Sequence, residues 1–237
     1  MYDTELADVY DAIYRGRGKD YPAEAAQVHE LITDRKADAT DLLDVASGTG
    51  AHFGPFTELF GHVEGLELSE AMVRISGDRH PAVTVHQGDM REFDLGRTFH
   101  AVTCMFSSIG YMSDQADLDR ALAAFAKHLE PGGVIVIEPW WTPEKFLPGY
   151  VGGDVVKVDG RTIARVSHSR REGDHTHMDV HYTVADAENG IRHFTDTHVI
   201  TLFTREQYET AFERAGCAVD YVEGGPSGRG LFVGVVK

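Results

Sequence analysis

The 237-residue sequence predicts an α/β fold, with a doubly wound, mostly parallel seven-stranded sheet and an inserted antiparallel β layer. Between about residues 23 and 138, short and uniformly apolar runs alternate with segments of helical periodicity, a pattern typical of a parallel sheet covered on both faces. The glycine turn Gly48-Thr49-Gly50 follows the first of these runs, as at the start of a ligand-binding helix. Beyond residue 140, apolar residues alternate with polar ones, which is typical of antiparallel strands.

The elements of the first part follow one another in a regular order. A helix is expected at residues 23–33, with Pro22 at its start, where its missing N–H is tolerated. Apolar runs predict strands at residues 41–46, 63–68, 83–87, 101–106 and 133–138. Helical spacing predicts helices between them at residues 52–60, 69–77 and 115–129. Ser69 is expected to cap the second of these helices, and the sequence Glu130-Pro131-Gly132-Gly133 to end the third.

The inserted layer is expected between residues 151 and 202. Its alternating β-branched residues are separated by the turn sequences Asp159-Gly160, Glu172-Gly173 and Asn189-Gly190, which predicts an antiparallel meander. The expected division of the chain is a cofactor-binding core of residues 1–139 and 203–237 around an insertion at residues 140–202. This insertion would cover the ligand-binding edge of the sheet or contribute to a dimer interface.

The chain then returns to the main sheet. A helix is expected at residues 204–215, with Thr204 as N-cap and Glu206 and Gln207 in the capping-box region. Two strands at residues 218–223 and 230–236 complete the sheet.

Composition argues against several classes of function. Lys and Arg total 22 against 38 Asp and Glu, and the formal charge of −16 argues against nonspecific nucleic-acid binding. No apolar run has the length of a membrane span and the N-terminus shows no signal-peptide pattern, so no membrane association is expected. Cys104 and Cys217 form no disulfide or metal-binding pattern, which favours reduced thiols in the cytoplasm.

The glycine turn indicates a cofactor that contains a nucleoside. Glu67, on the strand after the turn, can accept hydrogen bonds from ribose hydroxyls. A dinucleotide site needs a third glycine three residues after Gly50, where this sequence has Phe53. Asp44, at the end of the preceding strand, would repel a pyrophosphate but tolerates a cationic sulfonium. The turn therefore favours S-adenosylmethionine (SAM) over a nicotinamide cofactor, with an ordinary βα turn as the other alternative.

The segment Asp44-Val45-Ala46-Ser47-Gly48-Thr49-Gly50 resembles the first motif of the class I SAM methyltransferases, although Ala46 replaces their usual first glycine. The segment that ends in Gly88-Asp89-Met90 resembles their third motif, and Leu129-Glu130-Pro131-Gly132-Gly133 resembles a later turn. The resemblance implies a Rossmann-like fold with SAM as cofactor, its adenine beside Asp89 and Met90. The expected cofactor-binding residues are Tyr21, Asp44, Ala46, Gly48, Gly50, Glu67, Leu68, Asp89, Met90 and Met105.

Five further segments are similar to one group within this class. They are residues 14–21, 104–110, 138–141, 165–169 and 224–230. Together they resemble the TDP-3-amino-sugar N,N-dimethyltransferases, which finish desosamine- and mycaminose-type sugars for macrolide antibiotics, and the resemblance covers essentially the whole chain. It implies a homodimeric enzyme that uses SAM to methylate the 3-amino group of a TDP-linked amino-deoxyhexose twice.

Residues outside the core support an anionic substrate. A nucleotide diphosphate needs charged and hydrogen-bonding donors, and a glycine-rich loop can bring backbone N–H groups close to phosphate oxygens. The expected substrate-binding residues combine such donors with aromatic walls: Tyr14, Arg17, Trp141, Tyr150, Arg165, Ser167, Ser227 and Arg229. Each arginine alone also fits a solvated surface charge, and packing explains the aromatic residues about as well.

Methyl transfer from a sulfonium depends mainly on positioning, because the electrophile is already activated. The amine must be neutral to attack and loses a proton after methylation. In the resembling family a histidine can lie near the reacting nitrogen, but this sequence has Tyr111 at that position. We expect Tyr111 to orient the amine rather than act as an essential base, since a phenol is a poor base at neutral pH. Tyr14 is the other expected catalytic residue and would close over the site. The sequence leaves open whether Tyr14, Tyr111 or water takes the proton.

Other functions remain open from the sequence alone. The chain could methylate another small-molecule oxygen or nitrogen nucleophile, or it could bind SAM without catalysis and serve in assembly. His175, His177 and His181 alternate along a predicted strand, but no acidic or cysteine ligand pattern accompanies them. They are therefore interpreted as exposed strand residues, and no metal is expected.

Overall fold

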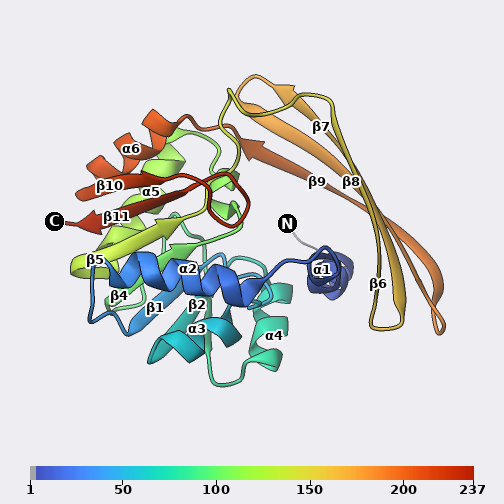
Figure 1. The fold of residues 1–237 in the computed structure, drawn as a ribbon, viewed down its shortest axis with the longest axis horizontal. Helices are drawn as coiled ribbons and strands as arrows, with labels where there is room; N and C mark the ends of the chain where they lie inside the picture. Colours follow the sequence, from blue (N-terminus) through green and yellow to red (C-terminus); the bar gives the residue numbers. More distant parts are fainter. Residues whose placement is uncertain (1–3) are drawn as a thin grey trace.

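The computed structural model describes residues 4–237, and the side-chain surroundings from residue 9 onward. Its larger sheet has seven strands in the order β10-β11-β5-β4-β1-β2-β3 (Figure 1). The strands are β1 (Asp41–Val45), β2 (His62–Glu67), β3 (Thr84–Gln87), β4 (Phe99–Cys104), β5 (Leu129–Ile137), β10 (Cys217–Val222) and β11 (Leu231–Val236). All neighbours run parallel except β11, which is antiparallel to both β5 and β10. The predicted doubly wound, mostly parallel sheet is confirmed.

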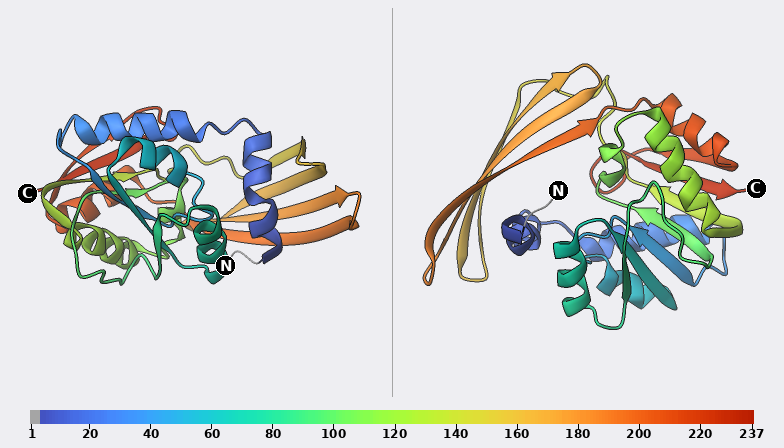
Figure 2. Two further views of the ribbon diagram at one scale, coloured as in Figure 1. Left: turned by 90° about the horizontal axis from the view of Figure 1, so that it is seen from below. Right: turned by 180° about the vertical axis from the view of Figure 1, so that it is seen from behind.

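Helices cover both faces of this sheet. They are α2 (Tyr21–Thr33), α3 (Phe53–Leu59), α4 (Glu70–Arg79), α5 (Gln115–Lys127) and α6 (Arg205–Arg214). One apolar cluster packs α2 and α3 against the sheet, and another packs α5 and α6 against the opposite face (Figure 2). Both predicted caps form: Ser69 accepts a hydrogen bond from Met72 N, and Thr204 and Gln207 form a capping box.

The second sheet is an antiparallel meander of four long strands, as the alternation between residues 151 and 202 predicts. They are β6 (Tyr150–Val158), β7 (Arg161–Glu172), β8 (His175–Asp186) and β9 (Gly190–Thr201). Its apolar inner face packs on α1 (Thr4–Gly16), which lies alongside it (Figure 2). The sheet thus reaches the rest of the molecule through this helix, through β9 and through the loops at its ends.

Three local predictions differ from the structure. The helix α1 was not predicted, although Val9, Ala12 and Ile13 have helical spacing and are buried against the second sheet. The strand predicted to reach residue 106 ends at Cys104, because Phe106 adopts a left-handed φ of 57° and a short 3₁₀ helix, η1 (Ser108–Tyr111), follows.

The start of β5 is the third difference. The helix predicted at 115–129 ends at Lys127, and the sequence Glu130-Pro131-Gly132-Gly133 lies inside β5 rather than in a turn before it. Leu129 already pairs with Phe99, and the register then shifts before Ala101. This irregularity accommodates the proline and glycines, so a turn-like sequence occurs within a strand.

No helix among the described residues is both long and apolar enough to cross a membrane.

Candidate active site

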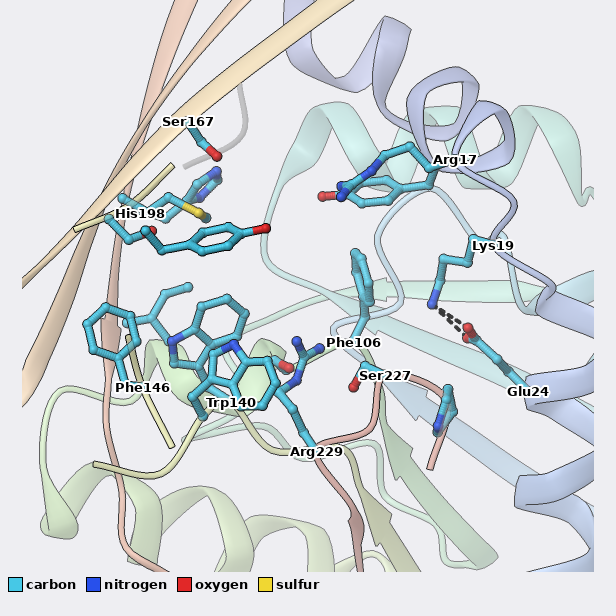
Figure 3. Close-up of a pocket in the computed structure, with 18 of the residues that line it drawn as sticks. Arg17, Lys19, Glu24, Phe106, Trp140, Phe146, Ser167, His198, Ser227 and Arg229 are labelled. Atoms are coloured by element: carbon cyan, nitrogen blue, oxygen red, sulfur yellow. Dashed lines mark hydrogen bonds and ion pairs between the residues drawn. The ribbon is translucent and has the colours of Figure 1, made fainter. Parts of the chain in front are cut away.

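A pocket of about 760 Å³ lies between the carboxyl edge of the large sheet, the N-terminal helices and the inner face of the second sheet. Every expected substrate-binding residue lines it, together with Tyr111. In Figure 3, Ser167 faces the space from the second sheet, Arg17 from the end of α1, and Arg229 from the C-terminal glycine loop. Segments far apart in the sequence therefore converge on one cavity.

Arg165 is a buried charge of this pocket without a carboxylate partner among the described side chains. Arg165 is 7% exposed, and its Nη1 donates a hydrogen bond to Ser167 Oγ over 3.1 Å. Its Nε has no hydrogen-bond partner, and no carboxylate among the side chains of residues 9–237 lies within ion-pair distance of it. A buried guanidinium in this state is costly unless an anion neutralises it. The geometry fits an anionic ligand at Arg165.

The other two pocket arginines already have partners. Arg17 forms an ion pair with Asp154 over 3.1 Å and is partly exposed. Arg229 lies 3.4 Å from Glu138 Oε1 and donates from Nε to the carbonyl of Pro139 over 3.1 Å. Its guanidinium also lies over the rings of Trp140 and Trp141, with centroids at 5.0 and 5.5 Å. Arg229 therefore holds the aromatic wall in place, whatever it contributes to a ligand.

Tyr14 lies among these arginines and packs edge-on against Phe106, with ring centroids 4.8 Å apart. Burial raises the pKa of Tyr14, and the charges of Arg165, Arg17 and Arg229 only partly offset this effect. The phenol is thus protonated at neutral pH and can donate a hydrogen bond into the pocket.

Glu138 is a site residue that no sequence prediction assigned a role. It is fully buried at the carboxyl end of β5, and its Oε2 accepts from the backbone N–H of Phe106 over 2.8 Å. Its Oε1 accepts from the hydroxyl of Ser227 and faces Arg229. Glu138 thereby joins the loop after β4 to the C-terminal glycine loop. The available signal was its place at the end of an apolar parallel strand, where ligand-binding groups gather.

Lys19, Glu24 and His52 form a second group that the sequence did not reveal. Lys19 Nζ lies 2.6 and 2.7 Å from the two carboxylate oxygens of Glu24 (Figure 3). His52 Nε2 lies 2.9 Å from Glu24 Oε2. Burial opposes the ionisation of Glu24, but hydrogen bonds from His52 and Lys19 outweigh it and lower the pKa. This charged group connects the pocket to the residue just before α3, after the glycine turn.

The glycine turn has the backbone of a ligand cradle. Ala46, Gly48 and Gly50 adopt left-handed φ angles of 56°, 57° and 74°, which explains why a glycine is usual at the first of these positions. An ideal Cβ placed on Gly48 would meet no described atom within 4 Å, so open space lies beside its backbone. Ser47 Oγ is buried there without a hydrogen-bond partner in the described structure.

Glu67 stabilises this turn. Its two carboxylate oxygens accept from the backbone N–H groups of Gly48 over 2.9 Å and Ser69 over 2.8 Å. Burial raises its pKa, and these backbone hydrogen bonds oppose the increase. Each carboxylate oxygen has a second lone pair for a ribose hydroxyl. Open space at Gly48, the unpaired Ser47 hydroxyl and the placed carboxylate together fit the nucleoside of SAM.

Asp44 is buried at the end of β1, where its Oδ1 accepts from Thr103 Oγ1 over 2.8 Å. Burial raises the pKa of Asp44 to about 6, against opposing effects of His52 and Thr103. At neutral pH an ionised carboxylate therefore faces the turn at a cost in folding free energy.

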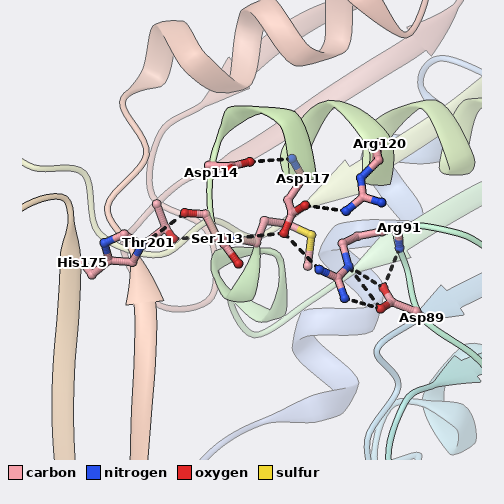
Figure 4. A network of polar contacts seen from close by, with 9 residues as sticks. Asp89, Arg91, Ser113, Asp114, Asp117, Arg120, His175 and Thr201 are labelled. Carbon is pink, nitrogen blue, oxygen red and sulfur yellow. Dashed lines mark hydrogen bonds and ion pairs between the residues drawn. The ribbon is translucent and has the colours of Figure 1, made fainter.

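Asp89 is held by an arginine in this structure. Arg91 donates to both of its carboxylate oxygens and also reaches Asp117 over 3.0 Å (Figure 4). These hydrogen bonds lower the pKa of Asp89. From Asp117 the polar network continues through Ser113 N to the base of the second sheet. A contact between Asp89 and adenine stays a prediction, and Arg91 is part of its surroundings.

The remaining expected cofactor residues occupy varied positions, and their roles stay predictions. Leu68 is 54% exposed beyond β2, and Met90 packs partly buried against the core. Met105 lies in the apolar cluster beside α2 and does not line the pocket. Tyr21 starts α2, with its ring centroid 5.0 Å from that of His52.

The strand histidines make separate contacts. His175 Nε2 lies 3.2 Å from the carbonyl of Ser113, and His177 forms an ion pair with Glu172 over 3.3 Å. His181 instead lies beside His193 on the exposed face. Among the described residues, no three His, Cys, Asp or Glu side chains are placed to hold a metal ion.

Comparison with known proteins extends these observations. Residues 42–133 match a family described as methyltransferase domain. A curated relative from Streptomyces venezuelae, named dTDP-3-amino-3,4,6-trideoxy-alpha-D-glucopyranose N,N-dimethyltransferase, is 59% identical over 235 residues, and the match covers 99% of each chain.

Two solved structures share the whole architecture. The crystal structure of DesVI from Streptomyces venezuelae is 58% identical, with a TM-score of 0.96 over 100% of both chains. SAM-bound CalS10, an amino pentose methyltransferase from Micromonospora echinaspora involved in calicheamicin biosynthesis, is 52% identical, with a TM-score of 0.90 over 97% of both chains. The likeness therefore includes the second sheet and the pocket walls as well as the SAM-binding core.

Proposed function

The chain belongs to the TDP-amino-sugar N,N-dimethyltransferases, a family of SAM-dependent methyltransferases, and we propose that it dimethylates the 3-amino group of a TDP-linked amino-deoxyhexose. The product would be a desosamine-type sugar for macrolide antibiotic biosynthesis. SAM is the cofactor, and the enzyme is an N-methyltransferase.

The buried, uncompensated guanidinium of Arg165 carries the substrate proposal. It opens on a cavity large enough for a sugar nucleotide, beside the hydroxyls of Ser167 and Tyr14. A diphosphate would supply the missing negative charge and accept these hydrogen bonds. A neutral nucleophile of another class would leave Arg165 unpaired, which disfavours the alternative of a different oxygen or nitrogen acceptor.

The protein contributes mainly by positioning the reactants. SAM supplies an electrophilic methyl group when it is bound at the glycine turn. Glu67 and the Gly48 backbone would hold its ribose there, while Arg165 and Ser167 hold the diphosphate at the opposite wall. Phe106 and Tyr111 line the same pocket and would exclude water from the reacting nitrogen.

Turnover with a panel of substrates tests this proposal. The protein is incubated with SAM and TDP-sugars that carry an amino group at C3, at C4 or nowhere, and the products are read by mass spectrometry. We expect a gain of one and then two methyl groups on the 3-amino sugar. SAM binding without turnover on any amino sugar would contradict the proposed function.

We also propose that the enzyme is a homodimer that pairs through the outer face of the second sheet. Val155, Val166, Ile191 and Val199 project from this face and are between 43% and 77% exposed. A second copy of the chain would cover these apolar side chains and the long strands that carry them.

We also propose a division of the chain into two parts and a cellular location for the enzyme. Residues 1–139 and 203–237 would form the SAM-binding core, and residues 140–202 would serve as the substrate and dimer layer. Of the proposed core, α1 packs on the second sheet, and residues 1–3 lie outside the described structure. SAM and sugar nucleotides are cytoplasmic metabolites, and Cys104 and Cys217 are buried free thiols. We therefore assign the enzyme to the cytoplasm, with no nucleic-acid or membrane partner.

A further inference from the structure

Tyr111 and His198 form a pair at the wall of the pocket. The Tyr111 hydroxyl oxygen, at the end of η1, lies 2.8 Å from Nδ1 of His198 on β9, 87 residues later in the chain. Both residues line the pocket, and Figure 3 shows His198 on the side of the second sheet. His198 is 8% exposed and Tyr111 is 38% exposed, so Tyr111 is the more accessible member of the pair.

The neighbours of the imidazole indicate which of its nitrogens accepts a proton. Asp196 Oδ2 lies 3.6 Å from Nε2, which favours the tautomer with its proton on that nitrogen. Nδ1 then carries the lone pair that accepts from the Tyr111 O–H. Across the strand pair, His198 is opposite Met178, so no charged group of β8 occupies that register position.

Burial is the main effect that keeps His198 neutral near pH 7. Burial lowers the pKa of the imidazole, Asp196 opposes this effect, and the charge of Arg165 on β7 adds to it. A neutral imidazole is ready to take up a proton, and the carboxylate of Asp196 stabilises the cation that results.

We propose that Tyr111 and His198 together take up the proton that the substrate amine must lose. Tyr111 is the catalytic residue in contact with the amine, and His198 is the positioning residue behind it. The inference rests on the proposed function of the same pocket. It also removes the objection that a phenol is a poor base, because the phenol passes on one proton as it receives another.

The proton transfer balances without a further reactant. An N–H bond of the bound ammonium breaks, its proton bonds to the phenol oxygen, and the phenol proton moves to His198 Nδ1. The amine keeps the electron pair with which it attacks the methyl carbon. The imidazolium beside Asp196 returns its proton to solvent before the second methylation.

The pH dependence of Tyr111→Phe and His198→Gln tests this inference. We measure kcat and KM for the 3-amino sugar nucleotide at saturating SAM, across the range in which the amine titrates. At about pH 7 both variants should lose roughly 100-fold in kcat, and the loss should shrink to a few-fold near about pH 10, where the amine deprotonates in solution. The double variant should lose no more than either single variant, because the two residues act as a unit.

His177→Gln is the matched control, because this histidine lies on β8 outside the pocket lining and should give wild-type kinetics. A loss in His198→Gln that is equal at every pH would show a purely structural bond between η1 and β9 and overturn the inference. Wild-type behaviour in Tyr111→Phe, which keeps the ring and its packing, would overturn it as well. If the wild-type protein methylates no amino sugar at all, the proposed function fails first, and the inference fails with it.

Discussion

At the residue scale, the site contains two buried charges that the fold does not neutralise. The guanidinium of Arg165 has no carboxylate partner among the side chains of residues 9–237, and Asp44 is buried beside a single hydroxyl donor. Groups of this kind reduce the free energy of unfolding and are retained where a ligand needs them. Both residues lead to predictions about stability, and Arg165 also leads to one about substrate binding.

Replacing Arg165 should weaken substrate binding and stabilise the empty protein. In Arg165→Met, the loss of charged hydrogen bonds to the diphosphate should raise the KM for the sugar nucleotide roughly 10- to 100-fold, with the KM for SAM unchanged. The melting temperature without substrate should rise, because a buried charge is removed. Steady-state kinetics and thermal unfolding measure the two effects.

Arg229→Met is the matched control for that prediction. It removes the cation beside the fully buried Glu138, so it should lower the melting temperature. If Arg165→Met instead destabilises the protein and leaves the KM unchanged, Arg165 serves packing rather than the substrate.

Asp44 should make stability depend on pH. Burial raises the folded-state pKa of Asp44 to about 6. Below the ordinary pKa of an aspartate, the protonated form therefore stabilises the fold fully, and this stabilisation is lost as the pH rises through about 6. The loss should approach roughly 3 kcal/mol. Asp44→Asn cannot ionise, so it should exceed the wild type in free energy of unfolding at pH 8 but not at pH 4, in urea titrations without SAM. The same difference at both pH values would argue against a raised pKa.

At the element scale, α1 connects the second sheet to the core. Val9, Ala12 and Ile13 pack against the inner face of that sheet, and the next residue, Tyr14, enters the pocket. From the same helix, Asp11 accepts from Thr49 Oγ1 in the glycine turn over 2.6 Å and forms an ion pair with Arg79 of α4. One helix thus contacts both expected ligand sites.

Truncation of Ile13 should therefore affect stability and substrate binding together. Its residue is 2% exposed, and Ile13→Ala should lower the free energy of unfolding by about 2–5 kcal/mol. It should also raise the KM for the sugar nucleotide, because Tyr14 loses its support. Arg15→Ala is the control: its ion pair with Asp159 is solvent-exposed and should contribute less than about 1 kcal/mol. Equal stability of the two variants in urea titrations would mean that α1 is not packed as described.

At the scale of the whole molecule, the parallel sheet and the antiparallel sheet have different roles. The parallel sheet presents its carboxyl edge to the cofactor, and the antiparallel sheet turns one face to the pocket and the other outward (Figures 1 and 2). The outward face carries exposed valines on neighbouring strands, which a dimer partner would cover.

A charge on that outer face should therefore separate the protomers. Val166 lies on a central strand of the proposed interface. In sedimentation velocity we expect the wild type to be a dimer and Val166→Lys to be a monomer. Leu59→Lys, at the end of α3 and far from this sheet in the fold, is the control and should stay dimeric. An unchanged sedimentation coefficient in Val166→Lys would place the interface elsewhere.

Local patterns in the sequence predict the order of the elements from α2 onward, the glycine turn and the methyl donor. These depend on local patterns, namely the apolar period of a strand or helix, a cap such as Thr204, or an acid placed after a turn. The sequence also identified the segments that line the pocket, although only through their resemblance to a family. It does not predict α1, because the short apolar stripe of this helix is buried only by the second sheet, which follows much later in the chain.

Which side chains contact one another, and which charges form ion pairs, can be seen only in the folded structure. Arg165 and Arg229 look alike in the sequence. Among the described side chains, however, Arg165 has no carboxylate partner, whereas Arg229 faces Glu138, 91 residues away. Tyr111 meets His198 only because β9 passes beside η1. Burial and charge pairing depend on the packing of distant segments, which no local period encodes. For that reason the amino-acid sequence predicts the fold and the methyl donor of the enzyme. The binding site for the acceptor amine and the proposed path of its proton depend on contacts that form only in the folded molecule.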